Sequence, residues 1–399
     1  MPGYLTLDEI PLAHKVVLLR ADLNVPMKDG IVTDNARLTR LLPTLQELSK
    51  AHAKIVILSH FGRPEGKRNS KYSLRPVAAA LQSIWGRTIA FADDCIGPTA
   101  LKAISALPEG DILVLENTRF YAGEESNDLQ FAKELAALGD VYINDAFSAA
   151  HRAHASTEGL AHLLPCAAGR LMQAELTALQ KALGHPERPL AALVGGSKIS
   201  TKLDLLENLI AKVDFLILGG GMANTFLAAE GIKVGKSLFE PDMLDTARTI
   251  ASKASTQNCR LLLPQDAVVA TALQANIATS IVPVGKVPPD SMILDIGPVS
   301  TKDIANILQT CKTVIWNGPL GAFEFHPFDR STVNIARTVA ALTKEGKILS
   351  VAGGGDTVAA LTAAQVIDDF SYVSTAGGAF LEWMEGKTLP GVAALEIKR

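Results

Sequence analysis

The stretch PLAALVGG, residues 189–196, is an uncharged apolar run that stops at two glycines. An uninterrupted apolar run is typical of a strand buried on both faces, and the glycines predict a tight turn into a helix. Similar runs recur along the chain, and segments with helical spacing separate most of them. This alternation predicts an α/β fold with a doubly wound parallel sheet in each half. The other expected strands are residues 15–20, 54–59, 87–92, 111–116 and 140–145 in the first half, and 213–221, 260–264, 292–297, 313–318, 347–355 and 372–375 in the second.

Chain length and one helical segment predict the division into domains. The chain has 399 residues, and a usual domain size of about 150 residues gives two or three domains. A helical apolar spacing begins at Met172 and stops at Gly184, which prolines follow. We therefore expect a first lobe over residues 1–170, a connecting helix over 171–186 and a second lobe from residue 187.

Composition and charge argue against several classes of partner. With a net charge of −3, the chain has no overall excess of basic residues of the kind that binds nucleic acid or an anionic membrane surface. The 4 cysteines are too widely spaced for a zinc motif or a disulfide framework. The N-terminus carries Asp8 and Glu9 and lacks a signal-peptide pattern, and the uncharged stretch 267–285 is too polar for a membrane span. These features predict a cytoplasmic protein.

Arginine and histidine follow the expected strands of the first half. The carboxyl ends of parallel strands meet at one edge of a sheet, where ligands of such folds bind. Guanidinium groups suit carboxylate and phosphate oxygens, so this edge predicts a site for a small polyanion. A solvated rim with local ion pairs is the alternative. The arginines at this edge are Arg20, Arg37, Arg63, Arg119 and Arg152.

Glycine-rich turns follow the expected strands of the second half. Backbone N–H groups at such turns can bind phosphate, because no Cβ blocks the approach and the following helix favours negative charge. Tight connections between strands and helices also need glycine, so the turns alone do not decide between these interpretations. The turns lie at residues 195–198, 219–221, 297–298, 318–321 and 353–357.

Known nucleotide fingerprints do not match these turns. Residues 231–237 resemble a P-loop but have one intervening residue too few, and no GxGxxG opens a helix after a strand. The motifs of protein kinases, serine hydrolases and zinc proteases are also missing. One anion-binding edge in each half suits phosphoryl transfer, in which a protein mainly positions reactants and neutralises charge. A dehydrogenase lacks its fingerprint here, and a non-catalytic nucleotide-binding protein remains the main alternative.

Eleven ordered blocks of the sequence resemble the phosphoglycerate kinase family along essentially the whole chain. This resemblance implies two Rossmann-like lobes with an active-site cleft between them. The blocks are RADLNVP (20–26), DNAR (34–37), SHFGRP (59–64), LENTRFYAGEE (115–125), NDAFSAAHRAHAS (144–156), GGSKISTK (195–202), GGGMANTFL (219–227), LPQD (263–266), DIGP (295–298), WNGPLGAFE (316–324) and GGGDT (353–357).

The resemblance implies reversible transfer of a phosphoryl group between ATP and the 1-carboxylate of 3-phosphoglycerate, giving ADP and 1,3-bisphosphoglycerate. The implied ligands of 3-phosphoglycerate in the first lobe are Asp22, Asn24, Arg37, His60, Arg63, Arg119 and Arg152. The implied nucleotide ligands in the second lobe are Lys202, Glu324, Gly353, Gly354, Gly355, Asp356 and Thr357, with Asp356 linked to magnesium. The implied catalytic residues are Arg37, Lys198, Lys202, Gly377 and Gly378.

The resemblance also implies that the lobes, the second over 187–384, close by hinge bending, with a tail over 385–399 that returns to the first lobe. Nothing in the sequence points to an obligate interface, so a monomer is expected. Two of these roles have an alternative interpretation. In it, Lys198 pairs with an acidic neighbour when no ligand is bound, and Glu324 caps a helix instead of binding the ribose. His151 and His154 are more simply scaffolding than ligands, and Trp316 and Phe323 are expected to pack. Two positions depart from the family pattern: Ala174 replaces a common lysine, and Ala376 replaces a common glycine beside Gly377.

Overall fold

The computed structural model describes residues 3–397. The chain divides into two compact units, one formed by the residues up to Leu176 together with those from Thr388 onward, and the other by Thr177–Lys387. The chain passes from the first unit to the second within helix α6, Arg170–Leu179, which a π-helix, Gln180–Gly184, continues. None of the described helices is long and apolar enough to cross a membrane.

The first unit is built on a parallel sheet with the strand order β5-β6-β4-β1-β7-β8. Helices α1 and α2 cover one face, where Leu38 and Val77 join the core around Val17 and Ile55. Leu18, which points to the opposite face, is also wholly buried, so both faces are covered. The strands are β1 Val16–Arg20, β4 Lys54–Leu58, β5 Ile89–Ala92, β6 Ile112–Leu115, β7 Val141–Asn144 and β8 Cys166–Ala168, with a small hairpin of β2 Met27–Lys28 and β3 Ile31–Val32. The helices are α1 Ala36–Lys50, α2 Arg75–Trp85, α3 Gly97–Ala106, α4 Ala122–Glu125 and α5 Leu129–Ala136.

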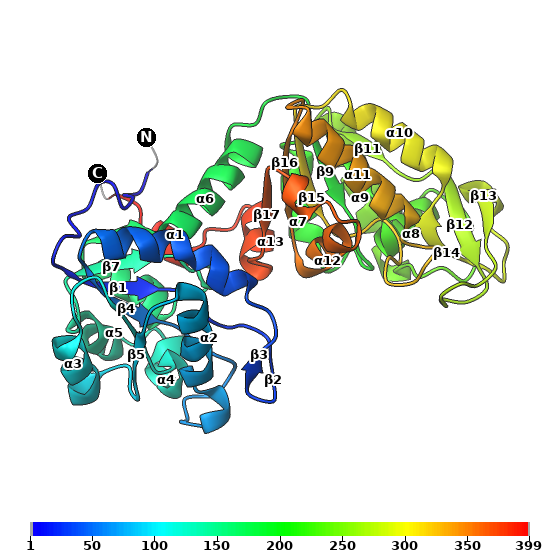
Figure 1. Cartoon of the computed structure of the whole chain (residues 1–399). Helices are drawn as coiled ribbons and strands as arrows, with labels where there is room; N and C mark the ends of the chain where they lie inside the picture. The colour runs from blue at the N-terminus through cyan, green and yellow to red at the C-terminus, as the bar shows by residue number, and fades with distance from the viewer. Residues whose placement is uncertain (1–2, 398–399) are drawn as a thin grey trace. The chain divides into compact units, whose positions relative to one another are not determined.

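The second unit contains a parallel sheet with the order β11-β10-β9-β15-β16-β17. Strands β9, β15, β16 and β17 are labelled in Figure 1. Its core gathers large apolar side chains such as Trp316, Ile335 and Leu361. The strands are β9 Leu190–Val194, β10 Phe215–Leu218, β11 Arg260–Leu262, β15 Thr313–Asn317, β16 Leu349–Gly353 and β17 Tyr372–Ser374. The helices are α7 Leu203–Ile210, α8 Gly220–Ala229, α9 Leu244–Thr256, α10 Pro298–Leu308, α11 Arg330–Lys344, α12 Gly355–Ala363 and α13 Gly378–Met384.

A separate antiparallel sheet corrects one expectation for the second unit. The apolar run 292–297 forms a strand, β14 Met292–Ile296, but this strand pairs with β12, Asp266–Ala270, and not with the parallel sheet. The third strand is β13, Ser280–Pro283, so the stretch 267–285 is largely strand and turn. The fold class is confirmed: an α/β protein with two six-stranded parallel sheets.

The last described residues belong to the first unit. Helix α14, Pro390–Ala393, lies against the segment after β7, where Gly391 N–H donates to the carbonyl of Ala150 at 2.8 Å. Beyond it, Glu396 forms an isolated antiparallel bridge with Tyr4. The two ends of the chain therefore complete the same unit.

Candidate functional site

A cationic cavity of about 230 Å³ lies in the first unit. Its walls are the segments that follow β1, β4, β6 and β7, which are four neighbouring strands of the sheet. The loops therefore meet at the carboxyl edge of the sheet, as expected for a ligand site in this fold. The lining residues are Asn24, His60, Gly62, Arg63, Arg119, Ser148, Ala149, His151, Arg152 and His154.

The charge of this cavity is of one sign. Three arginines and three histidines line it, and no carboxylate is among the described lining residues. Burial, reinforced by Arg119 and other nearby cations, lowers the pKa of His154 to about 4. The pKa of His60 is lowered well below its usual value by burial and by Arg20 and Arg119. Both histidines are therefore neutral at neutral pH, and a bound anion would relieve the repulsion among the arginines.

Asp22, Asn24 and Arg37 form a hydrogen-bonded group beside the cavity. Arg37 is the second residue of α1, and its Nη1 lies 2.7 Å from Asp22 Oδ2 and 2.9 Å from the carbonyl of Asn24. Ser148 Oγ, in the cavity wall, donates to the same Asp22 oxygen at 2.5 Å. Asn24 Oδ1 accepts from the N–H of Gly62 at 3.0 Å. The structure thus brings all seven expected acceptor-site residues to one edge, with Asp22 and Arg37 adjoining the cavity lining.

Arg20 differs from the expectation of an arginine that faces ligand. It is fully buried, and its guanidinium donates to Ser156 Oγ at 2.8 Å and to the carbonyl of Ala21 at 2.6 Å. The physical reason is Glu124, a buried carboxylate that Ser156 connects to this guanidinium. Of the five arginines at this edge, three therefore line the cavity, Arg37 adjoins it, and Arg20 is internal.

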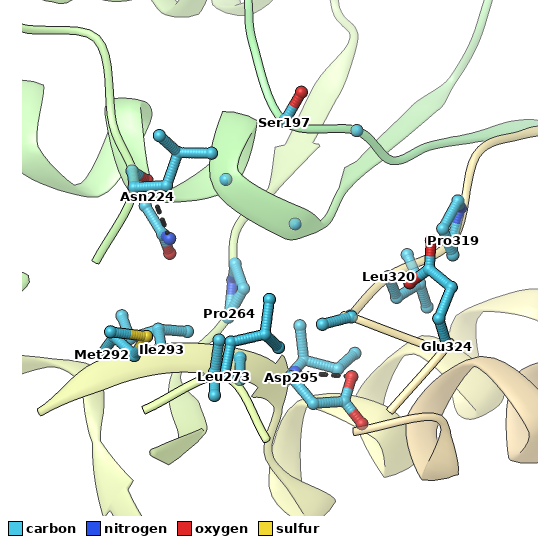
Figure 2. A pocket seen from close by; sticks show the side chains of 18 of the residues that line it. Ser197, Asn224, Pro264, Leu273, Met292, Ile293, Asp295, Pro319, Leu320 and Glu324 are labelled. Atoms are coloured by element: carbon cyan, nitrogen blue, oxygen red, sulfur yellow. Dashed lines mark hydrogen bonds between the residues drawn. The ribbon is translucent and has the colours of Figure 1, made fainter. Parts of the chain in front are cut away.

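A larger cavity, about 380 Å³, lies in the second unit (Figure 2). The turns after β9, β10, β15 and β16 supply one side, and these four strands are again neighbours in their sheet. The antiparallel sheet supplies the other side through Met292–Ile296 of β14. Asp295, Glu324 and Asp356 add three carboxylates to a lining that is otherwise mostly apolar. Motif reading did not assign the apolar lining residues Leu238 and Leu273 to a site, because isolated leucines carry no pattern. Pro264 and Leu294 lie in stretches that the sequence did single out, but nothing there indicated that they line a cavity.

Lys202 lies at the ends of β9 and β15 in the second unit. Its Nζ donates to the carbonyl of Gly195 at 2.6 Å and to Asn317 Oδ1 at 2.7 Å. Burial lowers the pKa of Lys202 from its usual 10.5 to about 8, against the opposing effect of Asp356. Asn317, which closes the predicted strand, also donates to the carbonyl of Gly353 at 2.9 Å. Sequence reasoning did not single out Asn317, although its position at a strand end was a signal.

Lys198 is exposed, on the segment between β9 and α7. Burial tends to raise the pKa of nearby Glu240, but hydrogen bonds from Ser200 and Ile199 and the charge of Lys198 lower it. This agrees with the interpretation that Lys198 has an acidic neighbour in the absence of ligand.

Two glycines show that the glycine-rich turns serve different purposes. A Cβ on Gly195 would lie 1.7 Å from the carbonyl oxygen of Pro319, so this glycine permits one turn to pack on another. A Cβ on Gly355 would meet nothing within 4 Å. Gly355 begins α12, whose first turn also carries the exposed Asp356. Open backbone at a helix N-terminus is the arrangement that binds phosphate.

The remaining expected residues of the second unit differ in whether their polar groups already have partners and in whether they line the cavity. The hydroxyl of Thr357 is already engaged, since it accepts from Gly318 N–H at 2.7 Å and donates to the carbonyl of Gly353 at 2.8 Å. Gly377 precedes α13 with φ 47°, and Gly378 begins that helix. Neither lines the nucleotide-sized cavity. Trp316 is buried in the core, as expected.

A third turn in the second unit is closed to anions. Gly297 precedes α10, and the buried carboxylate of Asp266 accepts from Val299 N–H at 3.0 Å and from Ser300 N–H at 2.8 Å. An internal carboxylate therefore takes the place that a phosphate would need. Within residues 3–397, no group of three or more histidine, cysteine, aspartate or glutamate side chains is placed to hold a metal ion.

Comparisons with known proteins agree on one family. The family model for phosphoglycerate kinase matches residues 7–387. A phosphoglycerate kinase of Rhodospirillum centenum is 61% identical over 393 residues, which cover 98% of this chain and 99% of that protein. One of Methylorubrum extorquens is 58% identical over 399 residues, covering 100% of both. The solved phosphoglycerate kinase of Coxiella burnetii superposes with a TM-score of 0.92 at 43% identity, over 98% of each chain.

Proposed function

This chain belongs to the phosphoglycerate kinase family, and on that premise we propose that its two cavities divide the substrates between them. The enzyme is a phosphotransferase with a carboxyl group as acceptor, and an ATP-binding kinase of glycolysis. We assign 3-phosphoglycerate to the cationic cavity of the first unit and the nucleotide to the cavity of the second. The observation that carries this assignment is the difference between the linings: six cationic or imidazole side chains in one, and an apolar wall with three carboxylates and, among the described residues, no cationic side chain in the other.

The acceptor site is proposed to bind both anionic ends of 3-phosphoglycerate. Arg63, Arg119 and Arg152 would supply guanidinium groups to the phosphate and the carboxylate, and His60 and Asn24 would supply neutral polar contacts. A carboxylate has an ordinary pKa near 4, so the attacking group is already ionised and no general base is needed. This agrees with the neutral state of the histidines in this cavity.

The nucleotide is proposed to place its base against the apolar wall and its phosphates towards α12. Glu324 would accept from the ribose hydroxyls, and the open backbone at Gly355 would approach the phosphates. Thr357 would position the turn after β15 and not contact the nucleotide itself, because its hydroxyl already accepts from Gly318 N–H. Lys202 would meet the phosphates from the ends of β9 and β15.

Asp356 fits magnesium that arrives with the nucleotide. Its carboxylate is exposed in the first turn of α12, at the lining of the cavity. Magnesium in nucleotide sites is held by one or two carboxylates and by phosphate oxygens, and one carboxylate is what this turn offers. Bound magnesium would neutralise charge on the phosphates.

Transfer itself requires charge neutralisation more than covalent chemistry. The acceptor carboxylate and the phosphates repel one another, and Arg37, Lys198 and Lys202 would offset this repulsion. The amides of Gly377 and Gly378 would add donors to the transferring group. In-line transfer in a closed cleft stays a prediction, as do the monomeric state and the cytoplasmic location.

Paired variants test the division of substrates. Arg63→Gln changes an exposed side chain of the first cavity, and Glu324→Gln changes a carboxylate of the second. We expect Arg63→Gln to raise KM for 3-phosphoglycerate about tenfold and to leave KM for MgATP unchanged, since it removes one charged hydrogen bond. We expect the reverse pattern for Glu324→Gln. The assay couples ADP formation to an optical signal. Equal effects of each variant on both KM values would refute the division.

A further inference from the structure

We propose that Arg20 is a positioning residue that fixes the ring of His60 in the neutral form with its hydrogen on Nε2, so that this hydrogen is donated to the bound acceptor substrate. The inference rests on the proposed function, since it concerns the cavity assigned there to 3-phosphoglycerate. His60 lines that cavity, whereas Arg20 does not.

The direction of one hydrogen bond carries the argument. Arg20 Nη2 lies 3.0 Å from His60 Nδ1. A guanidinium group stays protonated and has donors but no acceptor, so Nδ1 must be the acceptor of this bond. A neutral imidazole carries its single hydrogen on the other nitrogen in that case. His60 therefore has Nε2–H, and its lone pair on Nδ1 is occupied.

The guanidinium itself is held on its other sides. Its Nε donates to Ser156 Oγ at 2.8 Å, and its Nη1 donates to the carbonyl of Ala21 at 2.6 Å. Ser156 in turn donates to Glu124 through its hydroxyl at 2.5 Å and through its N–H at 3.0 Å. Arg20, Ser156 and Glu124 are all completely buried. Because each nitrogen of the guanidinium has an acceptor, the group cannot turn without leaving a buried polar atom unpaired.

Ser156 therefore has two connected functions. It links a buried positive charge to a buried negative charge, which reduces the cost of burying both. It also determines the plane of the guanidinium and so the direction from which Nη2 reaches His60. The connection runs from α4 through the π-helix Ala155–Gly159 and the end of β1 to the loop after β4.

The charges around His60 favour the same neutral form. Burial lowers the pKa of His60, and Arg20, Arg119, His154 and Arg37 lower it further. These groups come from β1, the segment after β6, the segment after β7 and α1. Protonation would in addition place a hydrogen on Nδ1 against an N–H of Arg20, which replaces a hydrogen bond by a contact of two donors. The hydrogen-bond geometry and the surrounding charges therefore both exclude the protonated, cationic form of His60.

The form of the ring decides what the cavity offers to an anion. With Nε2–H, His60 adds a directional donor to three guanidinium groups. With the hydrogen on Nδ1 instead, it would present a lone pair to an anionic oxygen, which is repulsive. We therefore expect loss of the Arg20 fork to raise KM for 3-phosphoglycerate about tenfold, the equivalent of one lost hydrogen bond to a charged group.

Nitrogen NMR of the histidine rings tests the proposal directly in the whole enzyme. The chain has 8 histidines, and His60→Gln identifies the signals of His60 by their disappearance. In the ligand-free wild type between pH 6 and 8, Nδ1 of His60 should be unprotonated and Nε2 protonated. Arg20→Lys keeps the charge but removes the fork, and should give a mixture of the two tautomers together with the rise in KM.

Ser156→Ala provides a second variant that keeps Arg20 itself, in case Arg20→Lys does not fold. It should shift the tautomer ratio in the same direction. Its matched control is Ser73→Ala, because Ser73 also donates to a buried glutamate, Glu116, at 2.9 Å but has no connection to His60. The control should leave the ring signals of His60 and KM for 3-phosphoglycerate unchanged.

The outcomes separate this inference from the function on which it rests. A wild-type His60 with its hydrogen on Nδ1, or with two hydrogens, overturns the inference. Tautomer signals that are identical in the wild type and in every folded variant of Arg20 and Ser156 overturn it as well. If the tautomer is as expected but the His60 signals do not respond to added 3-phosphoglycerate, the assignment of the cavity fails and the role of Arg20 as ligand orienter fails with it, while the tautomer result stands.

Discussion

The low pKa of Lys202 makes nucleotide affinity depend on pH above neutrality. In the ligand-free protein, burial lowers this pKa to about 8, so the ammonium loses its proton as the pH rises through that value. A phosphate beside Nζ favours the charged form and raises the pKa of the same group in the complex. The complex then holds more protons than the free protein above pH 8, and binding weakens as the pH rises.

The size of the effect follows from a pKa of about 8 for Lys202 in the ligand-free protein. We take Lys202 to stay charged in the complex up to pH 9. The affinity for nucleotide is then proportional to the fraction of free protein in which Lys202 is charged, so the dissociation constant rises about tenfold between pH 7 and pH 9. About 0.9 proton is taken up per nucleotide bound at pH 9 by the same relation. Titration calorimetry with MgADP in buffers of different ionisation enthalpy measures both quantities.

Two variants make the measurement decisive. Lys202→Arg keeps its charge throughout this range, so its affinity for MgADP should not change with pH. Lys302→Met, on the exposed side of α10, is the matched control and should reproduce the wild-type curve. Wild-type affinity that is constant from pH 7 to pH 9, or an equal loss in Lys202→Arg, would refute the reasoning.

Three further predictions concern single side chains. Arg37→Ala should lower kcat about 10²–10³-fold, as the loss of one preorganised donor does; the coupled assay measures this, and an unchanged kcat contradicts it. Asp356→Asn should raise the free magnesium needed for half-maximal activity, which a magnesium titration measures; an identical curve speaks against its role. Gly195→Ala should cost about 1–3 kcal/mol or more by overpacking against Pro319, whereas Gly355→Ala should unfold at the wild-type temperature but bind MgADP more weakly. Calorimetric scans that rank the two glycine variants the other way would exclude this interpretation.

Strand positions were predictable because buried parallel strands are short apolar runs that end in polar or glycine residues. The run 292–297 shows the limit of this pattern. It predicted the strand β14, but it did not predict which strand β14 pairs with. Partners of a strand are chosen by the packing of distant segments. The stretch 267–285 was not recognised as β12 and β13. The exposed residues of β13, such as Ile281, resemble a loop as much as an edge strand, whereas β12 is mostly buried and only its distant partner β14 identifies it as a strand.

The candidate sites were predictable where strand ends supply the residues. His60, Arg63 and Arg119 follow predicted strands and do line one cavity. Arg20 also ends a strand, yet its side chain is internal, where it donates to Ser156. The sequence did not predict this contact, because Ser156 lies 136 positions away and no local pattern connects the two residues. The apolar wall of the second cavity, with Leu273 as one member, likewise depends on long-range packing and left no signal.

The way the chain closes on its first unit has a consequence for synthesis. Residues Thr177–Lys387 form the second unit from one continuous stretch of chain, whereas the first unit combines its early residues with those after Lys387. On the ribosome, the second unit can therefore be complete while the first still lacks α14 and the bridge between Tyr4 and Glu396. The unit that is translated first is finished last, and until then the surface of Ala150 that receives Gly391 is open to the chaperones and proteases of the cell.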